Sequence, residues 1–305
     1  MNISTLLVVL ASWSIDPPVV IGLIITAVLY WAGFRYAKRR GIERRHLAPW
    51  RPWLFALTLV IIFLTLDSPL DTLADTYVYA HMIQHELLTM VAAPLLLLSQ
   101  PFMLIWRGVP LGARRATMKW MARTGWPLRT LEAIVGFWRK PAVSWIVFTG
   151  VFSAWHLPLL YDAATENDTI HAVEHMCFLV AAVFFWSQVI PSLPFKPRLS
   201  YIGQVVYFGL AALWGNVLGW AFMFSTTAIY PYYAALPHAA GAISAVTDEH
   251  LAGGVMDAAD TAIFLSVIII ALALWLRDDE RRQAERDAQI AASRVAALQS
   301  HSAQM

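Results

Sequence analysis

Two pairs of histidines have the spacing of metal ligands on a helix. His81 and His85 lie four residues apart in the segment HMIQHE, and His171 and His175 repeat this spacing in HAVEH. A spacing of four places two side chains on one helical face, one turn apart. Imidazole is a common ligand of copper, zinc and iron. Each pair is therefore suited to hold a metal ion.

Two further histidines extend this candidate site. His156 stands in the segment WHLP near the expected end of a helix, and His250 opens the last apolar helix. We expect His250 either to complete the site or to line an exit path. The histidines that we predict as metal ligands are His81, His85, His156, His171, His175 and His250.

Carboxyl groups accompany the histidines inside the apolar segments. Glu86, Glu174, Asp257 and Asp260 each lie two or three turns inside an expected helix. A carboxylate at the centre of a membrane helix costs about 2.5–3.5 kcal/mol on insertion scales, so it needs a partner or a watery cavity. We expect Glu174 and Glu86 to orient imidazoles or to neutralise an ion. Asp257 shares a helical face with His250 and is expected to act with it.

Long apolar stretches must position these residues. Of the 305 residues, 59% are hydrophobic and 14% are charged, which is too little charged surface to cover a soluble globule of this size. A helix needs about 20 residues to cross a bilayer. We therefore predict an all-α integral membrane protein with about seven transmembrane helices. They are expected at residues 19–34, 53–66, 77–98, 142–161, 170–190, 201–224 and 251–276.

Lysines and arginines fall only in alternate connections between these stretches. All 22 lie within residues 35–51, 107–140, 196–198 and 277–294, and acids such as Asp71, Glu166 and Asp248 occupy the opposite connections. Cytoplasmic loops carry the excess of Lys and Arg. We therefore expect the N-terminus outside and the C-terminus in the cytoplasm. Residues 1–18 would form an outer segment, 19–276 a seven-helix membrane domain, and 277–305 a charged cytoplasmic tail.

This orientation gathers the histidines on one side of the membrane. His46 and His301 fall on the inner side, and the other seven fall in outer loops or in the outer halves of helices. His238, in a loop rich in Ala, Tyr and Pro, is expected to be structural. The basic tract 38–45 stands beside a membrane helix, where it sets topology or contacts lipid, so we expect no nucleic-acid partner. Residues 1–14 lack the basic region of a cleaved signal peptide.

The residues leave the identity of the metal open. Copper(I) accepts thioethers as well as imidazole, although packing is the usual role of a membrane methionine. The methionines in or near the outer half are Met82, Met90, Met176, Met223 and Met256. The acids would favour a di-iron centre instead, and haem held by histidines is a further alternative. HAVEH also matches the HxxEH pattern of inverzincin proteases. The single cysteine, Cys177, excludes an internal disulfide and a CxxC motif.

Four segments resemble the polytopic CtaG-type cytochrome c oxidase assembly family. They are HMIQHELLTMVAAPLL at residues 81–96, WHLP at 155–158, HAVEH at 171–175 and HLAGGVM at 250–256. The resemblance runs from about residue 53 to residue 275, and the first segment is the most specific. The family often has Met-Trp where this chain has Met256-Asp257, so this sequence places an additional carboxylate in the membrane.

The resemblance implies a role in maturing haem-copper oxidases by handling copper outside the membrane. It implies copper as the bound metal and oxidase subunits as partners. The imidazoles by themselves leave zinc or iron as alternatives, and the apolar helices make membrane lipid a further partner. We therefore expect a bacterial cytoplasmic membrane location, with the site facing the periplasm or exterior as the distribution of Lys and Arg predicts. Such an assembly factor or metallochaperone needs no catalytic residue. The rival from the enzyme class is an intramembrane di-iron or haem oxidoreductase acting on quinol or lipid. A third reading is a scaffold whose histidines only form hydrogen bonds. The sequence leaves the oligomeric state open.

Overall fold

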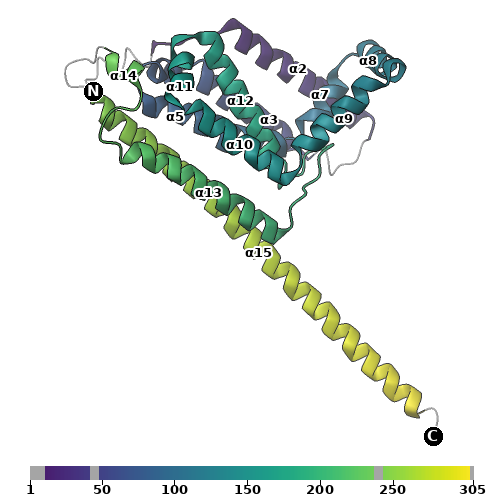
Figure 1. The fold of residues 1–305 in the computed structure, drawn as a ribbon. Coiled ribbons are helices and arrows are strands. Elements are labelled where there is room, and N and C mark those ends of the chain that lie inside the picture. Colours follow the sequence, from purple (N-terminus) through teal and green to yellow (C-terminus); the bar gives the residue numbers. More distant parts are fainter. Residues whose placement is uncertain (1–10, 42–47, 237–242, 303–305) are drawn as a thin grey trace.

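The computed structural model describes residues 11–41, 48–236 and 243–302, and this part of the chain is helical almost throughout (Figure 1). Its only extended pairing within those ranges is an isolated bridge between Ser192 and Phe195. The helices are α2 (Pro17–Arg39), α3 (Arg51–Leu66), α4 (Pro69–Ala74), α5 (Val78–Glu86), α6 (Ala93–Leu98), α7 (Pro101–Gly108), α8 (Leu111–Thr124), α9 (Trp126–Trp138), α10 (Pro141–Trp155), α11 (Pro158–Glu166), α12 (Asp168–Trp186), α13 (Tyr201–Met223), α14 (Pro231–Ala235) and α15 (Ala245–Ser302).

The apolar helices make this chain a multi-pass membrane protein, as its composition predicts. Six helical stretches in the described ranges are long and apolar enough to cross a membrane. A bent pair, α10 with α11, adds a seventh span if the two helices cross together. The six stretches are Pro17–Arg39, Arg51–Ala74, Val78–Leu98, Asp168–Trp186, Tyr201–Met223 and Ala245–Ser293.

The helix expected at residues 142–161 is not continuous. It breaks after Trp155, and α10 and α11 meet at an angle of 70°. Proline has no backbone N–H and disfavours helical geometry in the residue before it, so Pro158 ends the helix at this point. The break leaves His156 at the C-terminal end of α10, where its side chain can turn into the bundle.

The helix expected at residues 77–98 contains a π-helical turn. Residues Leu87–Ala92 form a π-helix between α5 and α6, directly after His85 and Glu86. Pro94 cannot donate the backbone hydrogen bond that a regular helix requires, and a π-helical turn absorbs such an interruption. The Trp186 indole donates to the freed carbonyl oxygen of Thr89 at 2.9 Å, which ties this turn to α12.

Glycine allows the bundle to pack closely at two places. Gly33 of α2 faces the backbone of Leu104 in α7, and Gly108 of α7 faces the backbone of Leu29; a Cβ atom at either glycine would collide with that backbone. In the same way Gly253 of α15 faces the backbone of α13. These contacts hold α7 against α2 and set α13 and α15 side by side (Figure 1).

Residues 277–302 continue α15 beyond the bundle. The helix runs without a break from Ala245 to Ser302 and extends well past the other helices (Figure 1). Most side chains from 277 to 293 are exposed, and Arg282 pairs with Asp278 one turn away. The charged tail expected from residue 277 is therefore helical at least as far as Ser302, and its last three residues lie outside the described part.

Basic connections meet at one end of the bundle, beside α7, α8 and α9. The Arg114 guanidinium lies 5.5 Å from the Tyr36 ring centroid, and Arg139 donates to the carbonyl oxygen of Lys196 at 2.5 Å. These contacts join three of the basic segments that the sequence places on one side.

Acidic residues meet at the opposite end, beside α4, α5 and α11. The Ser14 hydroxyl donates to an Asp71 carboxylate oxygen at 2.7 Å, and the Asp16 backbone N–H donates to Asp67 at 2.6 Å. The Gln84 amide donates to the other Asp71 oxygen at 2.9 Å. The start of α2 and the start of α5 therefore lie at the same end as the acids.

Candidate metal centre

Four imidazoles from two helices meet at the acidic end of the bundle. His81 and His85 come from α5, and their ring centroids lie 4.4 Å apart. His171 and His175 come from α12, with ring centroids 4.2 Å apart. Across the two helices, the His81 and His171 rings lie 4.9 Å apart and the His85 and His175 rings 5.5 Å apart. Both pairs predicted from spacing thus face each other.

Helix caps fix the first turns that carry these side chains. The Asp248 carboxylate accepts from the backbone N–H groups of Val78 and Tyr79, at 2.7 and 3.1 Å, and so caps α5 from a distant segment. The Asn167 side chain accepts from the N–H groups of Thr169 and Ile170 and caps α12. Such caps satisfy N–H groups that the helix itself leaves unpaired. The imidazoles therefore project from well-anchored helix starts.

Two overlapping sets of ligand atoms lie close enough to share an ion. One set comprises His81, His85 and His175, and the other His81, His171 and Glu174, with all ligand atoms of a set within 4.8 Å. The two Glu174 oxygens lie 3.5 Å from Nε2 of His81 and of His85. Opposed ligands about 2.1 Å from one ion are at most about 4.2 Å apart, so binding would draw these atoms slightly inward.

Tyr233 determines which nitrogen of His81 is available to a metal. Its hydroxyl donates to the Ala74 carbonyl oxygen at 2.6 Å, so its oxygen must accept the 3.4 Å hydrogen bond from Nδ1 of His81. A neutral imidazole carries one N–H, which leaves a lone pair on Nε2. That lone pair faces the Glu174 carboxylate, and a cation between them would stabilise both.

Most polar atoms of this cluster have no hydrogen-bond partner. Their side chains are buried or nearly so, and Glu174 has no exposed surface at all. Buried polar atoms nearly always find a partner, because leaving one unpaired costs about 1–3 kcal/mol. The unpaired atoms are both nitrogens of His85, Nε2 of His81, His171 and His175, and both carboxylate oxygens of Glu174. A set of converging nitrogen and oxygen electron-pair donors fits a metal ion.

His156 lies beside this cluster and has a different partner. Its Nδ1 lies 2.6 Å from the Phe152 carbonyl oxygen, and its Nε2 lies 3.2 Å from the Met82 sulfur. The His156 and His85 rings are 5.9 Å apart. The bend before Pro158 therefore brings His156 next to the four imidazoles, but outside both sets of shared ligand atoms.

The match to a known family covers most of the chain. The sequence profile of the cytochrome c oxidase caa3 assembly factor family matches residues 28–278. The chain belongs to this family. The family resemblance in the four histidine-bearing segments is thereby confirmed. The four clustered histidines of this caa3 assembly factor family member, and His156 beside them, fall within the matched range.

Similar curated proteins are themselves uncharacterised. The chain is 23% identical over 278 residues to an uncharacterised protein of Mycobacterium leprae, covering 90% of this chain and 41% of that protein. Uncharacterised proteins of Mycobacterium bovis and Mycobacterium tuberculosis are each 24% identical over 285 residues, covering 92% of this chain and 42% of theirs. The chain thus spans about two fifths of the length of these relatives. No solved structure matches it.

The structure places His250 and Asp257 of this family member away from the cluster. His250 Nε2 lies 2.8 Å from the Ser225 carbonyl oxygen, and neither residue belongs to the sets of shared ligand atoms among the described residues. Asp257 packs at Gly219, where α15 approaches α13. The glycine contacts between these two helices turn Asp257 toward α13. His238 lies outside the described residues.

Glu86 also faces away from the imidazoles. Its side chain is buried, and neither of its carboxylate oxygens has a hydrogen-bond partner. Its electrostatic interaction is with the carboxyl group of Asp260 on α15. Residues 85 and 86 are neighbours and so project about 100° apart on a helix. Glu174, rather than Glu86, is the carboxylate that the structure brings to the histidines.

An aromatic wall that sequence reasoning missed closes the cluster on one side. The Tyr161 ring lies 5.0 Å from the His81 ring and stacks on Tyr230 at 3.8 Å, and the Phe178 ring lies 4.3 Å from His85. Tyr230 and Tyr233 come from the loop and short helix before α15. Phe178 follows His175 by three residues on α12, a helical spacing that could have indicated a shared face. Tyr161 and Tyr230 come from other segments, so only the fold reveals their contact with the histidines.

Aspartates at the ends of the helices add negative charge near the cluster, and of these Asp75 lies outside the six membrane-spanning stretches. Asp71 and Asp168 both act electrostatically on His171. Burial, followed by the nearby charges of Asp71 and Asp168, raises the pKa of Asp75 to about 6. This acidic rim, defined as Asp71, Asp75 and Asp168, would attract a cation toward the histidines.

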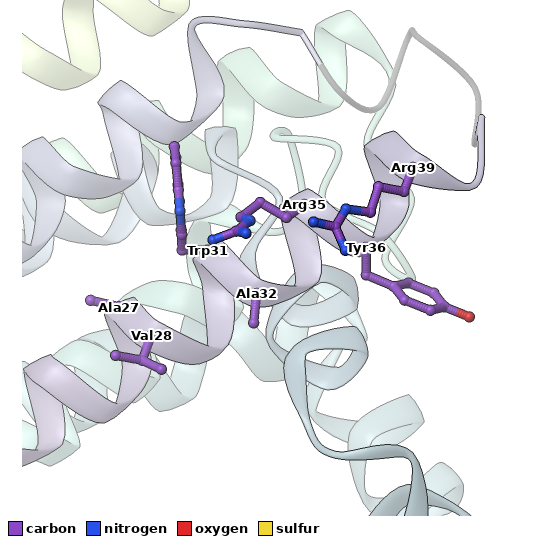
Figure 2. Close-up of a pocket in the computed structure, with 7 residues that line it drawn as sticks. All are labelled: Ala27, Val28, Trp31, Ala32, Arg35, Tyr36 and Arg39. Atoms are coloured by element: carbon purple, nitrogen blue, oxygen red, sulfur yellow. The ribbon is translucent and has the colours of Figure 1, made fainter.

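A separate groove on α2 has the chemistry of a lipid contact rather than of a metal site. It has a volume of about 580 Å³, and Figure 2 shows Trp31, Arg35 and Arg39 projecting along it. Its other lining residues are Ala27, Val28, Ala32 and Tyr36. Apolar side chains followed by arginines near a helix end suit the boundary between acyl chains and headgroups.

Proposed function

We propose that this chain binds copper at the histidine cluster and passes it to a haem-copper oxidase during assembly. The observation that carries the proposal is the convergence of buried imidazole nitrogens without hydrogen-bond partners. Copper is the cargo here, and no catalytic turnover is required. Membership of the caa3 assembly factor family supports the choice of a cytochrome c oxidase as the client.

The proposed orientation places the cluster at the outer face of a bacterial cytoplasmic membrane. In it, α10 and α11 together form a seventh span, the N-terminus lies outside and the C-terminus lies in the cytoplasm. The separation of basic and acidic ends supports this arrangement, because cytoplasmic loops carry the excess of Lys and Arg. Copper would then arrive from the periplasm or exterior past the acidic rim.

The ligand chemistry suits a site that releases its metal. Neutral imidazoles bind copper without adding charge, and the Glu174 carboxylate compensates part of the charge of the ion. More nitrogens converge than one ion requires, so an ion can exchange one imidazole for another on its way out. An oxidase subunit docking within the membrane would complete the transfer.

Metal analysis tests this proposal directly. Protein purified without metal-affinity tags and without added metal is compared with His81→Ala/His85→Ala and His171→Ala/His175→Ala. We expect copper in the wild type, its loss from both variants, and impaired oxidase maturation in cells that carry them. His250→Ala is the histidine control, because its Nε2 already contacts the Ser225 carbonyl oxygen. Unchanged metal content and unchanged oxidase maturation in both double variants would refute the metal site.

One observation favours a second candidate function. The set of His81, His171 and Glu174 mixes nitrogen and oxygen ligands, which iron accepts well. An intramembrane metal oxidoreductase acting on quinol or lipid would use such a site. Absorption spectra and iron content separate the two functions: a Soret band or stoichiometric iron supports the oxidoreductase, whereas a colourless protein that contains copper supports delivery.

A further inference from the structure

We propose that Met82 and His156 form a copper(I) subsite beside the imidazole cluster. The subsite uses one thioether sulfur and one imidazole nitrogen, and it rests on the proposed copper-handling function. It assigns Met82 a chemical role, and it specifies the oxidation state of the cargo.

The hydrogen bonds of His156 leave a lone pair facing the Met82 sulfur. Nδ1 lies 2.6 Å from the Phe152 carbonyl oxygen, which can only accept, so Nδ1 carries the proton. In the neutral imidazole, Nε2 then has no hydrogen and points at the sulfur at 3.2 Å. Two electron-pair donors facing each other at this distance repel, unless a cation lies within reach of both.

The surroundings of the pair favour an ion of low charge. Met82 is 1% exposed and His156 is 4% exposed. The Phe152 and Phe222 rings lie 4.7 and 6.0 Å from the His156 ring. Desolvation penalises an ion by the square of its charge, so a monovalent ion enters such a pocket far more readily than a divalent one. An imidazolium at His156 would meet the same penalty.

The chemistry of the two ligands selects copper(I) among monovalent ions. Thioether sulfur is a soft ligand that binds copper(I), whereas zinc and iron(II) prefer nitrogen, oxygen and thiolate. Alkali cations need oxygen ligands, and neither ligand atom of the pair is an oxygen. Copper(I) accepts as few as two ligands, placed on opposite sides of the ion, so binding would move the Met82 sulfur and His156 Nε2 apart from their 3.2 Å separation.

The subsite is connected to the main cluster through His85. Met82 and His85 lie three residues apart on α5, a spacing that places them on one face of the helix. The His85 and His156 rings are 5.9 Å apart. An ion held by Met82 and His156 therefore reaches the cluster by exchanging one neutral ligand for another. Copper remains copper(I) throughout, so no electron is transferred.

The test replaces the sulfur and keeps its volume. Met82→Leu removes the thioether at small packing cost. Met256→Leu is the matched control, because Met256 is equally buried in the same hydrophobic cluster. Copper(I) affinity is measured by competition with a copper(I) chelator on the full chain in detergent. Copper X-ray absorption reports a sulfur neighbour, and zinc(II) affinity reports on the imidazole cluster.

We expect Met82→Leu to lower copper(I) affinity at least tenfold and to remove the sulfur signal. Zinc(II) affinity should stay within twofold of wild type, and Met256→Leu should change neither property. If the wild type binds copper(I) with nitrogen neighbours alone, or if Met82→Leu leaves both readouts unchanged, the subsite is overturned and the proposed function stands. If the wild type binds no copper, the proposed function itself fails.

Discussion

Two polar clusters lie at the same end of the bundle, and they differ in how their polar atoms are satisfied. At the start of α15, the Asp248 carboxylate accepts from Val78 and Tyr79, and Glu249 accepts from Ile229 and Tyr230. In the histidine cluster, Nε2 of all four imidazoles and both Glu174 oxygens have no hydrogen-bond partner. The two clusters are similarly buried, so burial does not explain the difference.

The contrast separates a cluster of paired structural groups from the proposed metal site. Fully paired buried groups stabilise the fold, and removing one partner leaves the other unsatisfied. Unpaired buried groups lower the stability of the protein and persist where a ligand uses them. Substitutions at the start of α15 should therefore reduce stability, whereas substitutions in the histidine cluster should reduce metal binding.

The largest expected effect within this comparison is on metal affinity. Glu174→Gln keeps the shape of the side chain but removes the charge that lies 3.5 Å from two imidazoles. We expect copper affinity to fall about 10–100-fold, the range typical of groups that support metal ligands, while the melting temperature does not fall. Chelator competition measures the affinity, and Glu166→Gln, on the exposed end of α11, is the control. Unchanged affinity would remove Glu174 from the site.

The next effect is on stability at the start of α15. Glu249→Ala leaves the part-buried N–H of Ile229 and the buried N–H of Tyr230 without their acceptor, and an unsatisfied buried group costs about 1–3 kcal/mol. Thermal unfolding in detergent should show a clearly lower melting temperature, with normal copper stoichiometry in the fraction that stays folded. Asp278→Ala, in an exposed ion pair, should cost at most about 0.5 kcal/mol. Loss of copper without loss of stability would place Glu249 in the metal site instead of the structural cluster.

A smaller effect is expected at His250, the histidine that belongs to the structural cluster. His250→Ala removes one hydrogen bond to the Ser225 carbonyl oxygen, worth about 0.5–1.5 kcal/mol. Copper content should equal that of the wild type. Elemental analysis together with a melting curve checks both statements. A drop in copper content similar to that of His171→Ala/His175→Ala would extend the metal site to α15.

The smallest effect concerns the acidic rim and depends on pH. The pKa of Asp75 rises to about 6 in the folded protein from its ordinary value of 3.8. Between these values the folded state binds more protons than the unfolded state, so stability falls as the pH rises from about 4 to about 6. Asp75→Asn should therefore match wild type at pH 4 and melt slightly higher at pH 7.5. If the two proteins differed in melting temperature by the same amount at both pH values, the raised pKa of Asp75 would not be the cause.

Much of the fold and half of the site follow from patterns within single segments. The spacing of His81 with His85 and of His171 with His175 predicts a shared face, because helical geometry is local. Length and hydropathy predict the membrane helices for the same reason. The helix expected at residues 142–161 is bent before Pro158, and a hydropathy pattern does not predict such a bend.

The remaining parts of the site depend on packing between distant segments. Glu174 meets His81 and His85 across more than 85 residues of chain, and Met82 meets His156 only because α10 ends where it does. Distances between helices are set by side-chain and glycine contacts that no single segment encodes. The sequence alone thus determined the histidine pairs, the membrane class and the family resemblance. Only the tertiary structure decided which carboxylate faces the imidazoles and that His250 lies apart.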